Sequence, residues 1–275
     1  MGQYRLVAFD MDGTLLDSHK HISRATQQAV RLAAERGATI VLNTGRCMAE
    51  LTEYMELLPE VRYINSVSGG LVCDRVADRD IYSSTLDIDT VKKILKLVES
   101  EDVMIHFLNK ESIVQMDKVP DMYKYHMEAY KDMYERVTDQ WEDIIGQYLA
   151  APFRIPKLNL YHTSSEARNQ TRQKILAEQL NVELVDAETT SLEISAQGTD
   201  KGNGLEKLCQ YLNIPLSQTI VVGDADNDIA AMKKAGLAVA MKNANEHVKA
   251  LADVIVSDND HDGCREVLQN YGFIR

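Results

Sequence analysis

The chain has 275 residues, of which 45% are hydrophobic and 26% are charged, and its formal net charge is −12. This composition is ordinary for a globular protein that can bury a core, and the length suits one large domain or a domain with a smaller unit attached. The excess of negative charge disfavours nucleic acid and anionic membranes as main partners, because both are themselves negatively charged. A small anionic substrate is not excluded, since a local cation can outweigh a distant field.

The four cysteines are scattered along the chain and show neither a CxxC pair nor a zinc-binding spacing. We therefore expect reduced thiols, as in a cytoplasmic protein. No apolar run approaches the roughly 20 residues that a membrane-spanning helix needs. The first residues, MGQYRLVAF, lack the pattern of a secretory signal. The sequence thus predicts a cytoplasmic protein without membrane contact.

Strands and helices alternate in the first part of the chain. Leu6–Phe9 is an apolar run that predicts a short buried strand, and 23–36 has the helical spacing of apolar residues. The apolar run 38–43 predicts a second buried strand, which leads directly into Thr44. A further helix is expected next, followed by strands near 63–65 and 71–73.

The last part of the chain returns to the same alternation. A helix is predicted from Lys201, and three apolar strands separated by helices follow at 218–224, 235–241 and 252–257. Strands that alternate with helices imply parallel strands joined by right-handed crossovers, with helices on both faces of the sheet. The predicted fold class is α/β, with a Rossmann-like parallel-sheet core.

The middle of the chain, 81–194, has a different composition. It holds most of the tyrosines and the one tryptophan, Trp141. Its pattern predicts several strands, flanking helices and a long polar helical stretch around 121–147, as in an open α+β layer. We expect two segments, 1–80 and 195–275, to form the core, and 81–194 to form an inserted α/β unit.

Acidic and polar residues follow three of the predicted strands. They are Asp10 and Asp12 after the first strand, Thr44 and Gly45 after the second, and the segment GDADND, with Asp224 and Asp228, after the strand at 219–223. In an open parallel sheet ligands bind beyond the carboxyl ends of the strands, so these groups converge if the strands are neighbours. Carboxylates as close as Asp10 and Asp12 repel each other unless a cation or a shared proton compensates. Their oxygens suit Mg²⁺, which often shares its ligand shell with a phosphate.

Each of these stretches has a plainer interpretation when it is taken alone. Asp-Gly pairs are typical of turns, and Asp or Asn before a helix is usually only a cap. Three such stretches at the same end of three strands favour a catalytic or binding site over three independent turns.

Four segments, in order, resemble the four motifs of the haloacid dehalogenase (HAD) superfamily. They are FDMDGTLLD at 9–17, NTGR at 43–46, the lysine in GTDKGNG at 198–204 and GDADND at 223–228. The tail at 239–263 is similar to that of the superfamily's Cof-type sugar-phosphatase branch. The resemblance implies a HAD-like core with a large α/β (α+β) cap domain between the second and third motifs, where this chain has its insertion.

The resemblance also implies roles for the acidic residues. Asp10 is expected to be the nucleophile that forms an aspartyl-phosphate, and Asp12 the general acid and base. Mg²⁺ is expected to be held by the side chain of Asp10, the backbone carbonyl of Asp12 and the side chain of Asp224. Asp228 would support the ion from its outer shell or through water.

A second group of residues is expected to bind the phosphoryl oxygens, on which charge spreads in the transition state. The group comprises the backbone of Met11, Thr44 with the backbone of Gly45, Lys201 and Asn227. The sequence departs from the superfamily at Ser68–Gly69–Gly70, where relatives usually read Asn-Gly-Ala, so a contact near the cap junction is expected to differ.

The resemblance implies a Mg²⁺-dependent phosphatase of small phosphorylated metabolites, such as sugar phosphates. A phosphotransferase or mutase that uses the same aspartyl-phosphate is an alternative, and so is a non-catalytic sensor of a phosphorylated ligand. The short segment between Asp17 and the first long helix disfavours the mutase, whose relatives usually carry a small helical cap there. The retention of Asp12 disfavours the sensor, because pure binding does not need an acid/base. The sequence carries no indication of the oligomeric state.

Overall fold

The computed structural model describes residues 3–187 and 189–274. By their internal contacts these residues divide into two compact units. The core unit comprises the first residues up to Arg46, Leu51–Ser83 and the segment from Asp200 onward. The inserted unit comprises Cys47–Glu50 and Ser84–Thr199.

The core unit is built on an eight-stranded sheet with the order β14-β13-β12-β1-β2-β3-β4-β5. The strands are β1 (Leu6–Phe9), β2 (Thr39–Asn43), β3 (Tyr63–Ser66), β4 (Leu71–Asp74), β5 (Arg79–Ser83), β12 (Thr219–Gly223), β13 (Leu237–Met241) and β14 (Val254–Val256). Six of them, β14 to β3 in the sheet order, are parallel, as the alternating pattern predicted. The last two, β4 and β5, turn back antiparallel at one edge.

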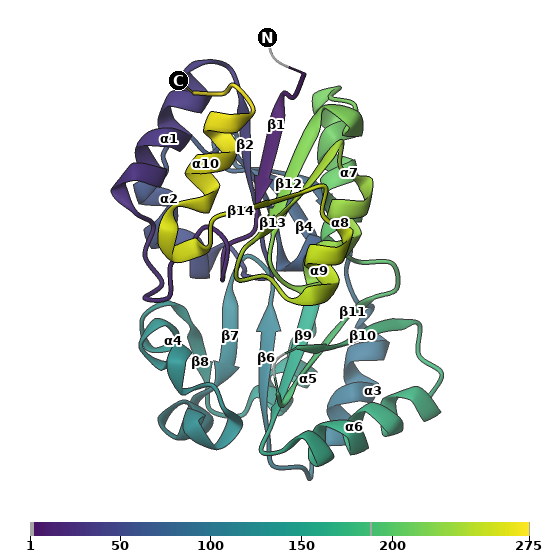
Figure 1. Cartoon of the computed structure of the whole chain (residues 1–275). Coiled ribbons are helices and arrows are strands. Elements are labelled where there is room, and N and C mark those ends of the chain that lie inside the picture. Colours follow the sequence, from purple (N-terminus) through teal and green to yellow (C-terminus); the bar gives the residue numbers. More distant parts are fainter. Residues whose placement is uncertain (1–2, 188, 275) are drawn as a thin grey trace. The chain divides into compact units, whose positions relative to one another are not determined.

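Helices cover both faces of this sheet (Figure 1). The helices are α1 (Arg24–Glu35), α2 (Thr52–Leu57), α7 (Lys201–Leu212), α8 (Ile229–Lys234), α9 (Glu246–Leu251) and α10 (Gly263–Asn270). Apolar side chains of α7, α8 and α9 pack on Leu6, Ala8 and Val41, and Figure 1 shows α1 and α10 on the other side. Because both faces are covered, the central strands are mainly apolar, and every residue of β1 is buried.

The inserted unit has its own six-stranded sheet with the order β10-β11-β9-β6-β7-β8. Its strands are β6 (Val103–Leu108), β7 (Ser112–Gln115), β8 (Asp139–Trp141), β9 (Lys157–His162), β10 (Val182–Ala187) and β11 (Ser191–Ala196). All neighbours are antiparallel except β7 and β8. This mixed sheet with its own core fits the α+β layer predicted for the middle of the chain.

The two faces of the inserted sheet differ in character. One face is apolar and packs with α3 (Ile88–Val98), α5 (Ile144–Ala150) and α6 (Ser165–Ala177) in a hydrophobic core. The other face is partly covered by the 3₁₀ segment η3 (Met116–Tyr125) and by α4 (Lys131–Val137).

The prediction of a long helical stretch around 121–147 is wrong. In its place the chain forms the end of η3, the short helix α4, the strand β8 and the start of α5. The backbone of His126 is left-handed, with φ 57°, and Thr138 is extended, so a continuous helix is interrupted twice. The pairing of β8 with β7 decides the second break, and a polar helical pattern carries no information about that partner.

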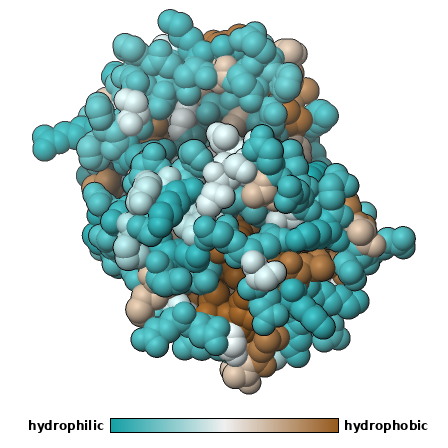
Figure 2. Space-filling view, turned by 90° about the horizontal axis from the view of Figure 1, so that it is seen from below, coloured by the Kyte–Doolittle hydropathy of each residue, from teal (hydrophilic) through white to brown (hydrophobic). Residues whose placement is uncertain are grey.

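The face that Figure 2 presents is mainly hydrophilic, with some hydrophobic residues gathered on it. Exposed apolar side chains of the inserted unit include Leu149, Leu176 and Val185. Some exposure of apolar side chains is common on folded proteins. Among the described residues, no helix combines the length and the apolar character that crossing a bilayer would require.

Candidate functional site

The carboxyl ends of three adjacent core strands meet at one edge of the sheet. Strand β1 pairs with β12 on one side and with β2 on the other. The first residues after these strands are Asp10, Asp224 and Thr44. These three strands are therefore neighbours, as convergence of the polar groups requires. The groups lie together at the edge where such sheets bind ligands.

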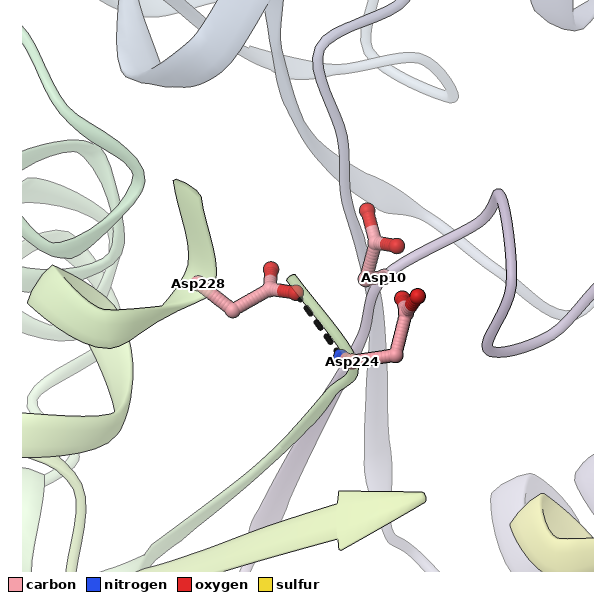
Figure 3. A group of neighbouring side chains, drawn as sticks. All are labelled: Asp10, Asp224 and Asp228. Atoms are coloured by element: carbon pink, nitrogen blue, oxygen red, sulfur yellow. Dashed lines mark hydrogen bonds between the residues drawn. The ribbon is translucent and has the colours of Figure 1, made fainter. Parts of the chain in front are cut away.

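Asp10, Asp224 and Asp228 form a compact carboxylate cluster. Each offers an oxygen atom, and these atoms all lie within 4.8 Å of one another (Figure 3). Gly13 makes the close approach possible, because a Cβ on it would lie 2.4 Å from Oδ2 of Asp224. The backbone of Gly13 is also left-handed, with φ 80°, a conformation that glycine adopts without strain. An all-oxygen donor set of this kind fits a hard divalent cation.

Lys201 is the cation that the structure itself supplies to this cluster. Its Nζ atom lies 2.6 Å from Oδ1 of Asp10 and 2.8 Å from Oδ1 of Asp228, and the whole residue is buried. Burial opposes the charge on Lys201, but the two carboxylates outweigh it and raise the pKa of the ammonium group. Lys201 opens α7, whose start is capped by Asp200, and this places the side chain at the edge of the sheet.

One ammonium group does not balance three carboxylates. Burial raises the pKa of Asp10 well above its usual value; Lys201 opposes this effect, and Asp228 and Asp224 add to it. Burial and the Asp228 carboxylate likewise raise the pKa of Asp224 to about 6. Burial, together with the neighbouring carboxylates, thus disfavours the ionised forms of Asp10 and Asp224 more than Lys201 offsets, and a bound divalent cation would favour them.

Asp228 differs from the other two carboxylates because both of its oxygens are already engaged. Oδ2 accepts the backbone N–H of Asp224 at 3.1 Å, drawn as a dashed line in Figure 3, and that of Ala225 at 3.3 Å. Oδ1 accepts from Lys201. Asp228 therefore stabilises the loop after β12. Asp224 uses one oxygen, Oδ1, to accept a hydrogen bond from the hydroxyl of Thr14 at 2.9 Å.

Asp12 lies beside the cluster and is held by two cations. Arg46 donates from Nε to one oxygen and from a terminal nitrogen to the other, both at 2.7 Å, and Nζ of Lys20 lies 2.8 Å from Oδ1. Burial pushes the pKa of Asp12 upward, but the hydrogen bonds and charges of Arg46 and Lys20 outweigh it and hold that pKa well below its usual range. Sequence reasoning missed both partners. Arg46 stands inside the NTGR motif and had a signal, whereas Lys20 had none.

The residues expected to bind phosphate lie around the same edge. Thr44 is buried, its N–H donates to the carbonyl of Asn65 at 2.8 Å, and its hydroxyl accepts from the N–H of Arg46 at 3.1 Å. Met11 is buried and Gly45 is half-buried. Asn227 is exposed, in the short 3₁₀ segment Asp226–Asp228.

A strained turn lies next to Thr44, at the position where the sequence departs from the HAD pattern. Val67, Ser68 and Gly69 have φ values of 52°, 55° and 92°. For a β-branched residue such as Val67 a positive φ is a true outlier, which the surrounding structure must hold in place. The N–H of Ser68 donates to the carbonyl of Thr44, and a Cβ on Gly69 would lie 2.0 Å from the carbonyl of Asp200. The turn thus packs directly between the end of β2 and the start of α7.

The inserted unit holds a buried polar network of its own. Nδ1 of His106 lies 3.0 Å from the hydroxyl of Tyr161 and 3.1 Å from that of Tyr134, and its Nε2 lies 2.7 Å from Oγ of Ser112. Because Ser112 donates to Glu50, Nε2 carries the proton of the imidazole and Nδ1 accepts from a tyrosine. Burial, with a smaller effect of Lys157, lowers the pKa of His106 to about 3, so the ring is neutral.

This network continues along β9 on the same face of the inserted sheet. Asn159 donates from Nδ2 to the hydroxyl of Tyr161 at 3.0 Å, and its Oδ1 is buried without a hydrogen-bond partner. Two residues along the strand, Nζ of Lys157 lies 3.1 Å from Glu193 on β11. The face that carries no α3, α5 or α6 is therefore rich in groups that can donate and accept hydrogen bonds.

The chain matches the family model of haloacid dehalogenase-like hydrolases over residues 7–268. The resemblance predicted from the four motifs is thereby confirmed. Among solved structures, the chain is similar to a haloacid dehalogenase-like hydrolase from Bacteroides thetaiotaomicron, with a TM-score of 0.86 and 24% identity. That match covers 97% of this chain and 99% of the other, and it concerns the fold.

Two curated relatives illustrate the range of the similarity. The chain is 27% identical to the 5-amino-6-(5-phospho-D-ribitylamino)uracil phosphatase YcsE of Bacillus subtilis, over 97% of this chain and 95% of that protein. It is 30% identical to the chloroplastic endoribonuclease YBEY of Arabidopsis thaliana over 98% of this chain, but spans only 47% of that protein. The second name therefore describes a much longer protein.

Proposed function

The chain belongs to the haloacid dehalogenase-like hydrolases, and from this premise we propose that it is a Mg²⁺-dependent phosphatase of small phosphorylated metabolites. The observation that carries the proposal is the meeting of Asp10, Asp224 and Lys201 at the edge of the core sheet. A nucleophilic carboxylate, an oxygen donor set for a cation and a fixed positive charge are the parts that phosphoryl transfer requires. The similarity to YcsE, which is named as a phosphatase, supports the same proposal.

In the first step, a carboxylate oxygen of Asp10 attacks the phosphorus atom. The bond between phosphorus and the leaving oxygen breaks, and Asp12 gives its proton to that oxygen. In the second step Asp12 takes a proton from water, which attacks the phosphorus and breaks its bond to Asp10. Inorganic phosphate is released, and both aspartates return to their starting forms.

Asp12 enters this sequence held by Arg46 and Lys20. Those contacts favour its ionised form, which suits the second step, where Asp12 acts as a base. Before the first step Asp12 must leave these contacts and take up a proton from solvent, which it then gives to the leaving oxygen. The negative charge of the phosphorylated substrate supports that change, because it attracts the same two cations.

Four groups are proposed to bind the phosphoryl oxygens: Lys201, Thr44 with Gly45, the backbone of Met11 and, at the exposed rim, Asn227. Asp10, the carbonyl of Asp12 and Asp224 would hold Mg²⁺, and Asp228 would support them from outside. Bound there, Mg²⁺ would offset the crowded carboxylates and the charge of the phosphate.

Removal of the metal tests the proposal. Release of inorganic phosphate from p-nitrophenyl phosphate is expected to cease in excess chelator and to return with Mg²⁺. Ca²⁺ is expected to compete with Mg²⁺ and inhibit, since it takes more ligands at longer distances and draws Asp10 out of line. Full activity in chelator would rule out the metal's role. Transfer of the phosphoryl group to added sugars in place of water would favour the phosphotransferase.

We further propose that the segment 81–194 selects the substrate. The core residues are proposed to bind only the phosphoryl group, which all candidate substrates share. Discrimination between substrates must therefore come from contacts to the leaving group. The polar network around His106, Tyr134 and Asn159 supplies suitable hydrogen-bonding groups.

The buried thiols of the four cysteines fit the reducing cytoplasm in which we place the enzyme.

Tyr134→Phe tests this second proposal, because it removes one hydroxyl from the network. The kcat/KM for substrates with hydroxylated leaving groups is expected to change by about tenfold relative to that for p-nitrophenyl phosphate, which alters the substrate ranking. Hydrolysis of p-nitrophenyl phosphate and its dependence on Mg²⁺ should be retained. The panel should include sugar phosphates and the ribitylaminouracil phosphate named for YcsE. Tyr148→Phe is the matched control, since its hydroxyl bonds to the carbonyl of Phe153 on the apolar side of the same unit. Identical rankings for both variants would contradict the proposal.

A further inference from the structure

Two buried asparagines stand side by side on adjacent strands of the core sheet. Asn43 ends β2 and Asn65 lies in β3, and the parallel register pairs the two residues directly. Both are fully buried. Nδ2 of Asn65 donates to Oδ1 of Asn43 at 2.6 Å. An amide pair at the centre of an apolar sheet calls for an explanation, because polar groups are costly to bury.

The carbonyl of Lys201 decides how the Asn65 amide is oriented. It lies 2.8 Å from the same Nδ2 atom, and a carbonyl oxygen can only accept. The amide nitrogen of Asn65 must therefore face Lys201, and Asn43 must turn its oxygen toward Asn65. Both protons of one amide group are thus used, one on each neighbour.

This arrangement leaves two buried atoms without a partner, Oδ1 of Asn65 and Nδ2 of Asn43. Each was removed from water on folding without a hydrogen bond in return, which lowers stability. Two apolar side chains of similar shape would fill the space without that loss. The pair is therefore poorly explained by packing alone.

The backbone of Asn65 makes a second connection. Its carbonyl accepts the N–H of Thr44 at 2.8 Å. The first turn of α7 also lies close against its side chain, since a Cβ on Gly204 would lie 2.1 Å from Oδ1 of Asn65. One residue thus bonds to the main chain of both Thr44 and Lys201, which come from segments of the core unit far apart in the sequence.

We infer that Asn65 is a positioning residue that holds Lys201 and Thr44 in register for the phosphoryl group. This inference rests on the phosphate-binding roles proposed for those two residues. Asn65 fixes the backbone of Lys201 at the start of α7, and the buried side chain then reaches Asp10 and Asp228 in one geometry. A small displacement of a positioned group is enough to cost about 10² in rate.

The test is a double-mutant cycle between Asn65→Ala and Lys201→Met, read as kcat/KM for p-nitrophenyl phosphate and as the Kd of orthophosphate. In the native background, Asn65→Ala is expected to lower kcat/KM by about 10- to 100-fold and to weaken orthophosphate binding. In the Lys201→Met background the same change is expected to have an effect of less than about threefold, because the ammonium group that Asn65 is inferred to position is absent.

Asn43→Ala is the matched control. It removes the other partner of the Asn65 amide but leaves the bond to the carbonyl of Lys201, so its effect on kcat/KM should be clearly smaller. Thermal unfolding of each variant separates loss of positioning from loss of fold. Equal losses from Asn65→Ala in both backgrounds, or a greater loss from Asn43→Ala than from Asn65→Ala, would overturn the inference alone. A wild-type protein that neither hydrolyses the aryl phosphate nor binds orthophosphate would overturn the proposed function and this inference with it.

Discussion

Asp10→Asn is expected to lower kcat by at least about a thousandfold, because a neutral amide can neither attack phosphorus nor hold a divalent cation well. The substitution keeps the shape of the side chain. Lys201 also keeps its bond to Asp228 at 2.8 Å, so the buried ammonium group is not left unpaired. The protein should therefore fold, and release of phosphate under saturating substrate measures the loss.

Asp17→Asn is the control for this substitution, since it makes the same chemical change in the same motif. Oδ1 of Asp17 accepts the backbone N–H groups of His19 and His21, both at 2.8 Å, and an asparagine oxygen can do the same. Its kcat should stay near that of the wild type. If Asp10→Asn kept more than about a hundredth of the wild-type kcat, Asp10 would not be the nucleophile.

Lys201→Ala is expected to lower kcat/KM by at least about a hundredfold, mainly through lost stabilisation of the transition state. It removes the ammonium group that contacts both Asp10 and Asp228. Lys201→Arg restores a positive charge and should keep part of the activity. The guanidinium is larger and planar, however, and the site is fully buried, so the recovery should be incomplete.

Lys234→Ala serves as the control for the loss of a paired cation. Nζ of Lys234 lies 2.5 Å from Oε2 of Glu206, in a part-buried pair that includes none of the carboxylates of Asp10, Asp224 and Asp228. Its removal should leave kcat/KM near the wild-type value. Complete and equal loss of activity in Lys201→Arg and Lys201→Ala would show that Lys201 has a role beyond that of a fixed charge, such as proton transfer.

The sequence by itself determined the elements whose signals are local. The apolar runs of β1, β2 and β12 are long enough to be recognised as buried strands, and the capping residue Asp200 stands immediately before the helix that begins at Lys201. It also determined which acidic residues end those strands, because a residue's place at a strand end depends only on its own segment. The family followed from four motifs read in order.

Tertiary structure alone decided which groups meet. Arg46 lies 34 positions from Asp12 and Lys201 lies 191 from Asp10, and no local pattern states that these pairs are in contact. The bond from Asn65 to Lys201 spans 136 positions and depends on the register of β2 with β3 and on the depth at which α7 packs. The left-handed backbone of Val67 is equally invisible in sequence, because only surrounding contacts hold a β-branched residue there. Pairing between distant segments is set by the packing of the whole core, and so the partners of the catalytic groups emerge only once the sheet is assembled.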